Sequence, residues 1–179
     1  MLIERRVMKL EKYIRNIPDF PKKGIQFKDI TTLLRDKKAF KATINGLAKI
    51  LKDKNIDYVV AAEARGFILG GALSYKLGCG FIPVRKPGKL PYRTYNHSYS
   101  LEYGTNELHI HEDALPKNAK VLILDDLLAT GGTALALVNL VKKFDADIVG
   151  VAFLIELTDL NGKEKFKEYP VYSLIKFKI

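Results

Sequence analysis

The chain has 179 residues, of which 47% are hydrophobic, a length and composition that suit one domain with a buried core. Lysine and arginine exceed aspartate and glutamate by 30 to 20, so the formal net charge is +10, which fits nucleic acid, a membrane surface or a polyanionic small molecule as a partner. The single cysteine, Cys79, excludes an intrachain disulfide, and no apolar run is long enough to cross a membrane. We therefore expect a cytoplasmic protein.

Hydrophobic periodicity predicts alternating strands and helices along the chain. Helices are expected, in order, at 2–16, at 39–54, after Gly66 through Leu77, and at 134–141, with a short charged helix or loop at 162–168. Strands are expected at 24–30, 58–62, 81–84, 121–124, 147–157 and 171–175. This alternation predicts an α/β fold in one domain, residues 1–179, with a central, mainly parallel β-sheet flanked by helices on both faces.

The stretch Val121-Leu-Ile-Leu-Asp-Asp-Leu-Leu-Ala-Thr-Gly-Gly-Thr133 joins a buried strand, two carboxylates and a glycine loop ahead of a helix. Such a loop can turn its backbone N–H groups toward a phosphate, and the helix start adds partial positive charge. Neither a nucleotide P-loop nor a Gly-x-Gly-x-x-Gly motif is present. Asp125 and Asp126 suit the hydroxyls of a ribose, so the pattern indicates a ribose 5-phosphate. The alternative is that these residues only cap and form a turn.

The same stretch resembles the phosphoribosyl-diphosphate (PRPP) signature of type I phosphoribosyltransferases, in the branch that uses adenine. The resemblance covers the chain from about Pro18 to its end and includes Phe20–Ile30, Glu63–Phe67, Arg85–Pro91, Ser100–Gly104 and Glu156–Thr158. It implies the type I phosphoribosyltransferase fold, with a small N-terminal hood at roughly 17–34 and a mobile lid loop at roughly 85–106. It also implies adenine and PRPP as substrates, AMP and diphosphate as products, Mg²⁺ bound mainly through PRPP and water, and a homodimer.

The resemblance assigns the base to the hood. Backbone groups at Gln26 and Lys28 would read adenine, with Phe27 stacked on one face of the purine and Leu157 on the other. A carbonyl followed by an N–H matches the 6-amino donor and N1 acceptor of adenine, whereas hypoxanthine offers the reverse pattern. Without the resemblance, Phe27 would be interpreted as an ordinary core aromatic.

The resemblance also assigns the two phosphate ends of PRPP. Arg65 would bind the diphosphate, in a loop that the family holds with a non-proline cis peptide, and Lys86 and Lys89 of the lid would add positive charge. Asp125 and Asp126 would hold the ribose hydroxyls. The 5-phosphate would bind at Ala129, Thr130, Gly131, Gly132 and Thr133. On sequence alone, Arg65 would be a surface ion pair and the lid an exposed hairpin.

Glu102 is the residue that the resemblance implies for the chemistry, with Tyr103 beside it. Related purine and orotate enzymes carry an aspartate where this chain has Ala129, so a carboxylate must come from elsewhere. Adenine has to lose or move a proton as its N9 attacks, and a carboxylate near N7 could take that role. On sequence alone, Glu102 would be a solvated loop residue.

Three alternatives stay open. A nucleic-acid-binding regulator that senses PRPP or purine on the same fold is supported only by the charge, and no helix-turn-helix is evident. A transferase that prefers hypoxanthine or guanine is disfavoured by Ala129 and the 26–28 segment. His109 and His111 lie on one face of a strand, but no motif supplies a third metal ligand. We therefore expect no protein metal site, no membrane and no specific nucleic acid.

Overall fold

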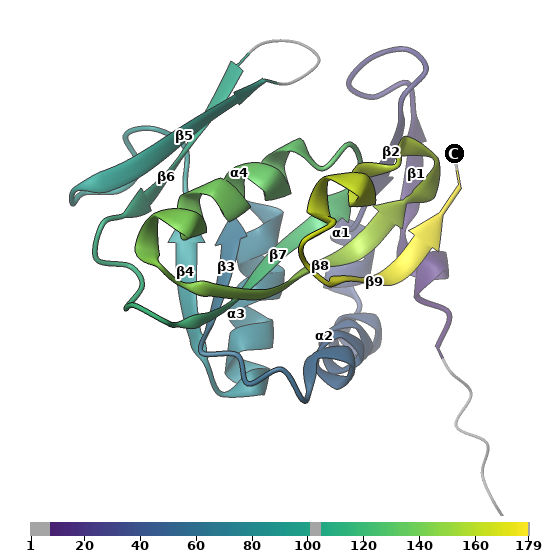
Figure 1. The fold of residues 1–179 in the computed structure, drawn as a ribbon. Helices are drawn as coiled ribbons and strands as arrows, with labels where there is room; N and C mark the ends of the chain where they lie inside the picture. Colours follow the sequence, from purple (N-terminus) through teal and green to yellow (C-terminus); the bar gives the residue numbers. More distant parts are fainter. Residues whose placement is uncertain (1–7, 101–104, 179) are drawn as a thin grey trace, which may run out of the picture.

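A five-stranded parallel sheet forms the centre of the computed structural model, which describes residues 8–100 and 105–178 (Figure 1). Its strand order is β4-β3-β7-β8-β9, and all four neighbouring pairs are parallel. The strands are β3 (Tyr58–Ala62), β4 (Gly80–Val84), β7 (Lys120–Leu128), β8 (Asp147–Leu157) and β9 (Val171–Phe177). The prediction of an α/β fold with a mainly parallel sheet is confirmed.

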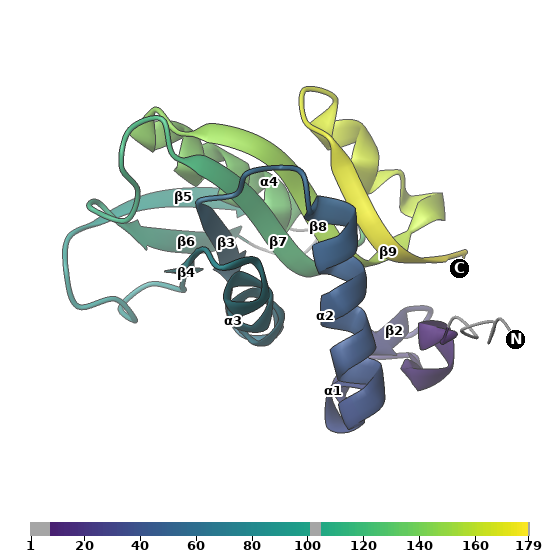
Figure 2. The same ribbon diagram turned by 90° about the horizontal axis from the view of Figure 1, so that it is seen from below.

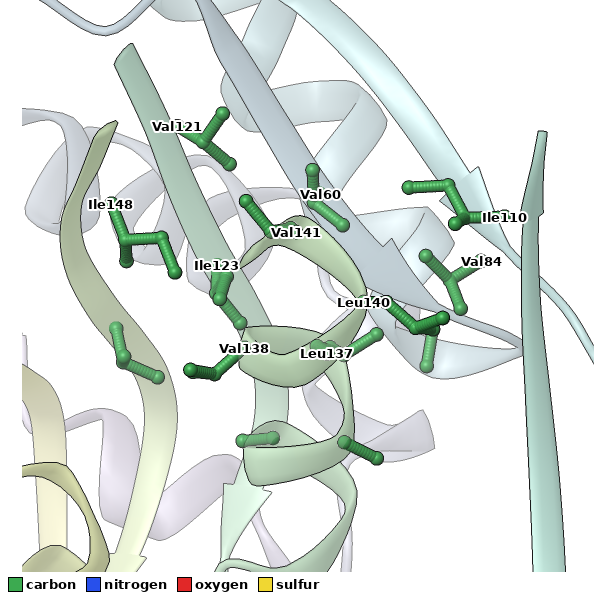
Figure 3. Close-up of a cluster of buried hydrophobic side chains, with 14 of the residues drawn as sticks. Val60, Val84, Ile110, Val121, Ile123, Leu137, Val138, Leu140, Val141 and Ile148 are labelled. Carbon is green, nitrogen blue, oxygen red and sulfur yellow. The ribbon is translucent and has the colours of Figure 1, made fainter. Parts of the chain in front are cut away.

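Helices cover both faces of this sheet (Figures 1 and 2). α2 (Lys37–Leu51) and α3 (Arg65–Leu77) lie on one face and α4 (Gly132–Val141) on the other. Alternate residues of the central strands therefore enter two cores. Val60 and Ile123 pack on the α4 face (Figure 3), whereas Val59 and Leu122 pack on the face covered by α2 and α3. Burial on both faces explains the continuous apolar runs in these strands. No helix within the described ranges is long and apolar enough to span a membrane.

Local capping sets the ends of two predicted helices. α2 begins two residues earlier than the apolar period suggested, because the Asp36 side chain accepts hydrogen bonds from the N–H groups of Lys38 and Ala39, at 2.9 and 2.8 Å. α3 ends at Gly78, whose φ of 72° closes the helix in the left-handed conformation. Short 3₁₀ helices complete the chain: η1 (Leu10–Tyr13), η2 (Lys142–Phe144), η3 (Thr158–Leu160) and η4 (Gly162–Phe166).

The predicted helix at 2–16 is wrong over the residues that the structure describes. After η1 the chain enters a strand, β1 (Arg15–Pro18), which pairs antiparallel with β2 (Gln26–Asp29). Arg15 lies opposite Asp29 in this ladder, and their side chains form an ion pair of 2.5 Å. Strand pairing and this ion pair favour a strand here, although the spacing of the apolar residues is typical of a helix.

Two small antiparallel sheets flank the central one. The hood consists of β1, β2 and α1 (Thr31–Arg35), and the hairpin consists of β5 (Thr94–Ser100) and β6 (Thr105–His111). Figure 1 shows them at opposite ends of the molecule, both extending in the direction in which β3 and β4 point. An isolated bridge between Arg85 and His109 ties the root of the hairpin to the chain after β4. The segment expected as a lid is therefore largely a hairpin, and its mobility stays a prediction.

Candidate active site

The site lies where the parallel strands end. β7 pairs with β3 only as far as Leu124, which lies opposite Ala61, and then continues beside β8 to Leu128. Asp125 and Asp126 thus belong to the end of the strand instead of following it, because the longer β8 still supplies a partner. Ligands of α/β sheets bind at such carboxyl ends.

The glycine loop after β7 leads directly into α4. Gly131, with a φ of 80°, is the N-cap, and no side chain caps the helix. The first N–H groups of a helix have no partner within it, so those of α4 are available to a ligand beyond its start. A Cβ on Gly162 of η4 would overlap the carbonyl oxygen of Ala129, so η4 supports the loop from behind at close range. The structure therefore places Ala129 to Thr133 in a loop at the start of α4, and phosphate binding there stays a prediction.

An ion pair joins α3 to the end of β7. Arg65 donates from Nε to Oδ2 of Asp126, whose residue is only 6% exposed, and the Asp126 N–H donates to Oδ1 of Asp125 at 2.9 Å. Burial, followed by the negative charge of Asp126, raises the pKa of the Asp125 carboxyl well above its ordinary value. Burial opposes charging of Arg65, but Asp126 and Asp125 outweigh it and raise the guanidinium pKa. The structure brings all three residues together at one edge of the sheet, with a direct bond between Arg65 and Asp126.

The turn after β3 is hydrogen-bonded to the residues that follow the neighbouring strand β4. The Glu63–Ala64 peptide is cis, as the resemblance implied for this loop. The Glu63 carboxylate accepts the backbone N–H of Lys86 at 2.7 Å and Nη2 of Arg85 at 2.9 Å, and the bond from Lys86 is the largest cause of the lowered Glu63 pKa. Glu63 thereby places the backbone of Lys86 beside the turn. The side chains of Lys86 and Lys89 are exposed.

The hood brings an aromatic ring to Arg65. The Arg65 guanidinium lies 5.5 Å from the ring centroid of Phe27, and Phe20 packs edge-on against that ring at 5.1 Å between centroids. Phe27 is half-buried and belongs to neither of the two core clusters, so it is not an ordinary core aromatic. Leu157, by contrast, is 6% exposed and belongs to the core on the α2 and α3 face.

The side chains of Gln26 and Lys28 are engaged by β1. Asn16 donates to Oε1 of Gln26 at 2.6 Å and accepts from Nζ of Lys28 at 2.9 Å. Side chains alternate along a strand, so Phe27 points to the opposite face. Within the described ranges, β1 is the sole strand partner of β2 in a two-stranded sheet, which leaves one edge of the β2 backbone for a ligand.

The remaining candidates lie outside the described residues or in the hairpin. Glu102 and Tyr103 fall between β5 and β6, outside the described residues. His109 bonds to Thr94 at 2.9 Å and to Glu107 at 3.0 Å, whereas Nε2 of His111 is buried without a hydrogen-bond partner. Over the part of the chain that the structure describes, no three His, Cys, Asp or Glu side chains converge on a point where a metal ion could bind.

Sequence reasoning missed two contributors. Glu63 was considered only as part of a loop, although its carboxylate organises the end of β4. Tyr99 was not considered, although its hydroxyl lies 3.4 Å from Oγ1 of Thr133 in the glycine loop. The alternation of Tyr95, His97 and Tyr99 was a usable signal, since it marks one side of a strand.

Comparison with known proteins agrees with this geometry. The family described as "Phosphoribosyl transferase domain" matches residues 31–179. Adenine phosphoribosyltransferase of Brachyspira hyodysenteriae is 58% identical over 170 residues, which cover 95% of this chain and 100% of the relative. The enzyme of the same name from Thermotoga sp. (strain RQ2) is 59% identical over 168 residues, covering 94% and 99%.

Solved structures show the same fold. The crystal structure of adenine phosphoribosyltransferase from Thermoanaerobacter pseudethanolicus superposes with a TM-score of 0.92 at 52% identity, covering 96% of this chain and 99% of that one. The Giardia lamblia enzyme complexed with 9-deazaadenine gives a TM-score of 0.90 at 35% identity, with coverage of 97% and 98%. The chain therefore belongs to the phosphoribosyl transferase family. Its relatives of high identity within that family are adenine phosphoribosyltransferases.

Proposed function

We propose that the protein transfers the 5-phosphoribosyl group of PRPP to N9 of adenine, forming AMP and diphosphate with inversion at the anomeric carbon. The observation that carries this proposal is the Arg65–Asp126 ion pair. It joins the start of α3, beneath the hood ring of Phe27, to the strand end that leads into the glycine loop. The residues proposed to bind the diphosphate, the ribose and the base are thus adjacent.

The phosphate and ribose ends follow from the strand edge. The N–H groups at the start of α4 and the Thr133 hydroxyl would bind the 5-phosphate, in the cradle of Ala129, Thr130, Gly131 and Gly132. Asp125 and Asp126 would accept hydrogen bonds from the ribose hydroxyls. Arg65, with Lys86 and Lys89 approaching from the chain after β4, would stabilise the departing diphosphate, because its negative charge grows as the C1′–O bond breaks.

The base would lie between the hood and the strand ends. The ring of Phe27 would stack on adenine, Leu157 would approach from the other face, and the free edge of β2 at Gln26 and Lys28 would read N1 and the 6-amino group. The hydrogen bonds with Asn16 support this arrangement, because they occupy the Gln26 and Lys28 side chains and leave recognition to the backbone. Hypoxanthine would leave these groups unsatisfied, which costs about 1–3 kcal/mol for a buried polar group.

Glu102 would accept the proton that adenine loses as its N9 bonds to C1′, with Tyr103 beside it at the reaction centre. Both residues connect β5 to β6, so the hairpin would carry them to the site. A closing hairpin would also exclude water from a ribose cation that water would otherwise capture.

A Mg²⁺ ion would be bound mainly by the substrate and water. Within the described ranges no three acidic or imidazole side chains converge, and Asp126 is already paired with Arg65, so an ion would take most of its ligands from PRPP oxygens and water. When bound, it would neutralise charge on the diphosphate.

A homodimer is supported by the outer face of α3. Ile68 is 47% exposed and Tyr75 is 90% exposed, and their seven-residue spacing places them on one stripe of the helix. The neighbouring β4 is the edge strand of the central sheet. A second copy of the chain would cover these apolar side chains.

The cytoplasm is the compartment that the cysteine content favours. The sole cysteine, Cys79, is half-buried, and burial raises the pKa of its thiol, which makes it a poor nucleophile. A chain without disulfides suits a reducing compartment.

The test is AMP and diphosphate formation from PRPP and Mg²⁺, with adenine, hypoxanthine and guanine assayed in parallel. We expect turnover with adenine and at least about a hundredfold preference for it, since the competing bases present the reverse hydrogen-bond pattern. Preference for another base would overturn the assignment of the hood backbone. Inactivity with all three would overturn the enzymatic proposal in favour of a regulator, for which retention of nucleic acid at moderate salt is the corresponding assay.

A further inference from the structure

Three residues on one side of β5 contact α4 or η2, the short helix that follows it. The ring of Tyr95 packs edge-on against Phe144 at 5.3 Å between centroids. Nε2 of His97 lies 3.1 Å from Nδ2 of Asn139. Tyr99, the third residue of this alternating set, reaches the glycine loop. The hairpin is thus docked along the helix whose start forms the phosphate cradle.

Tyr99 contacts the cradle through both its ring and its hydroxyl. A Cβ built on Gly132 would lie 3.8 Å from Cδ2 of Tyr99, so the ring lies over that glycine with room for no more than a methyl group between them. The Tyr99 hydroxyl lies 3.4 Å from Oγ1 of Thr133, within reach of a hydrogen bond. The ring is partly buried against the core on the α4 face, which restricts where the hydroxyl can point.

The direction of this hydrogen bond matters because Thr133 has a single hydroxyl hydrogen. A threonine hydroxyl donates one hydrogen bond and accepts up to two. When Tyr99 donates to Oγ1 of Thr133, the threonine hydrogen is left to donate toward the start of α4, where an anion would lie. When Thr133 donates to Tyr99 instead, that donor is lost to the anion. A bound phosphate therefore selects the arrangement in which Tyr99 donates.

We propose that Tyr99 is a positioning residue for the 5-phosphate: it orients the Thr133 hydroxyl toward the phosphate and links docking of the β5–β6 hairpin to occupancy of the cradle. This inference rests on the proposed function, which places the 5-phosphate at Ala129 to Thr133. Phosphate binding and hairpin docking then strengthen each other, since both use the same hydroxyl pair. The substrate end farthest from the base would thereby help to place the hairpin that carries Glu102.

The test measures ribose 5-phosphate binding by calorimetry and steady-state kinetics for Tyr99→Phe, with Tyr95→Phe as the matched control. Both changes remove one phenolic hydroxyl from the same side of β5, but Tyr95 contacts Phe144 instead of the loop. For Tyr99→Phe we expect the Kd of ribose 5-phosphate and the KM of PRPP to rise about 3–10-fold, the effect of one hydrogen bond. The KM of adenine should stay within about twofold, and Tyr95→Phe should match the wild type.

A double-mutant cycle with Thr133→Val separates this role from general support of the fold. If Tyr99 acts through the Thr133 hydroxyl, Tyr99→Phe adds nothing to the loss already caused by Thr133→Val. Unchanged ribose 5-phosphate affinity in Tyr99→Phe, or losses that simply add in the double variant, would overturn the proposal. If the wild-type protein binds ribose 5-phosphate but forms no AMP, the proposed reaction is overturned. The double-mutant cycle on ribose 5-phosphate affinity still tests the role of Tyr99 in that case.

Discussion

Arg65 on α3 donates from Nε to Oδ2 of Asp126 on β7, across 61 positions of sequence. The Asp126 side chain is 9% exposed and that of Arg65 is 42% exposed, so the carboxylate is buried beside this cation while the guanidinium still reaches solvent. Arg65 therefore pairs with Asp126 and keeps part of its guanidinium exposed, where the proposed function places the diphosphate.

Replacing Arg65 with Gln should lower kcat/KM for PRPP by about a hundredfold or more, because the diphosphate loses a bidentate donor. It should also cost about 1–3 kcal/mol of unfolding free energy, less than a fully buried pair would, since Arg65 is partly exposed. Adding Asp126→Asn should restore stability in denaturant titrations without restoring turnover. Near-normal turnover of Arg65→Gln would remove Arg65 from the diphosphate site.

Glu102→Ala should keep the fold and lower kcat by about a hundredfold or more, the usual contribution of a general base. Glu112→Ala, an exposed glutamate in the turn after β6, is the control and should behave like the wild type. Circular dichroism and AMP formation are compared for both variants. Equal turnover of the two would exclude Glu102 from proton transfer.

Gly162→Ala should weaken ribose 5-phosphate binding, because the added methyl group would overlap the carbonyl oxygen of Ala129 and displace the cradle. Overpacking of this kind costs about 1–3 kcal/mol of unfolding free energy, so the melting temperature should fall as well. Lys163→Ala, an exposed neighbour on η4, should leave both measurements unchanged. Normal phosphate affinity in Gly162→Ala would show that η4 does not support the loop.

Asp29 should make the hood sensitive to acid. The backbone N–H of Thr31, aided by Arg15 against the opposing effect of burial, lowers the Asp29 pKa from 3.8 to about 2. A carboxyl group whose pKa is lower in the folded than in the unfolded state contributes its full stabilisation at pH values above the unfolded-state pKa. This stabilisation is lost as the pH falls through the folded-state pKa. Asp29→Asn should remove about 2 kcal/mol of unfolding free energy at neutral pH and little near pH 2. Asp113→Asn, in the exposed turn after β6, should show no such pH-dependent difference.

Tyr75→Glu should separate the proposed dimer, because it places a charge on the exposed apolar stripe of α3. Sedimentation velocity should show a dimer for the wild type and a shift toward the monomer for the variant. Lys76→Glu, the adjacent exposed position, tests whether charge alone causes the shift. A dimer that persists in Tyr75→Glu would place the interface elsewhere.

Most of the central fold could be predicted because its determinants are local. The strand at 58–62 and the strand at 147–157 have the predicted bounds, since each is a continuous apolar run with polar residues at its ends. The glycine loop was equally visible, because a strand, glycines and a helix follow one another directly. The N-terminal segment could not be predicted this way: Arg15 pairs with Asp29 across the hood, and periodicity does not report such a partner.

The candidate site likewise has features that neighbouring residues determine and features that depend on tertiary contacts. By itself, the sequence determined the order of strands and helices, the glycine loop proposed to bind phosphate and the resemblance that names Glu102. Hydrophobic period, glycine chemistry and motif order are all properties of neighbouring residues. Only the tertiary structure decided that Arg65 bonds to Asp126, that Glu63 holds Lys86, and that Tyr99 reaches Thr133 over 34 positions. These contacts depend on which strand ends and helix starts the sheet places side by side.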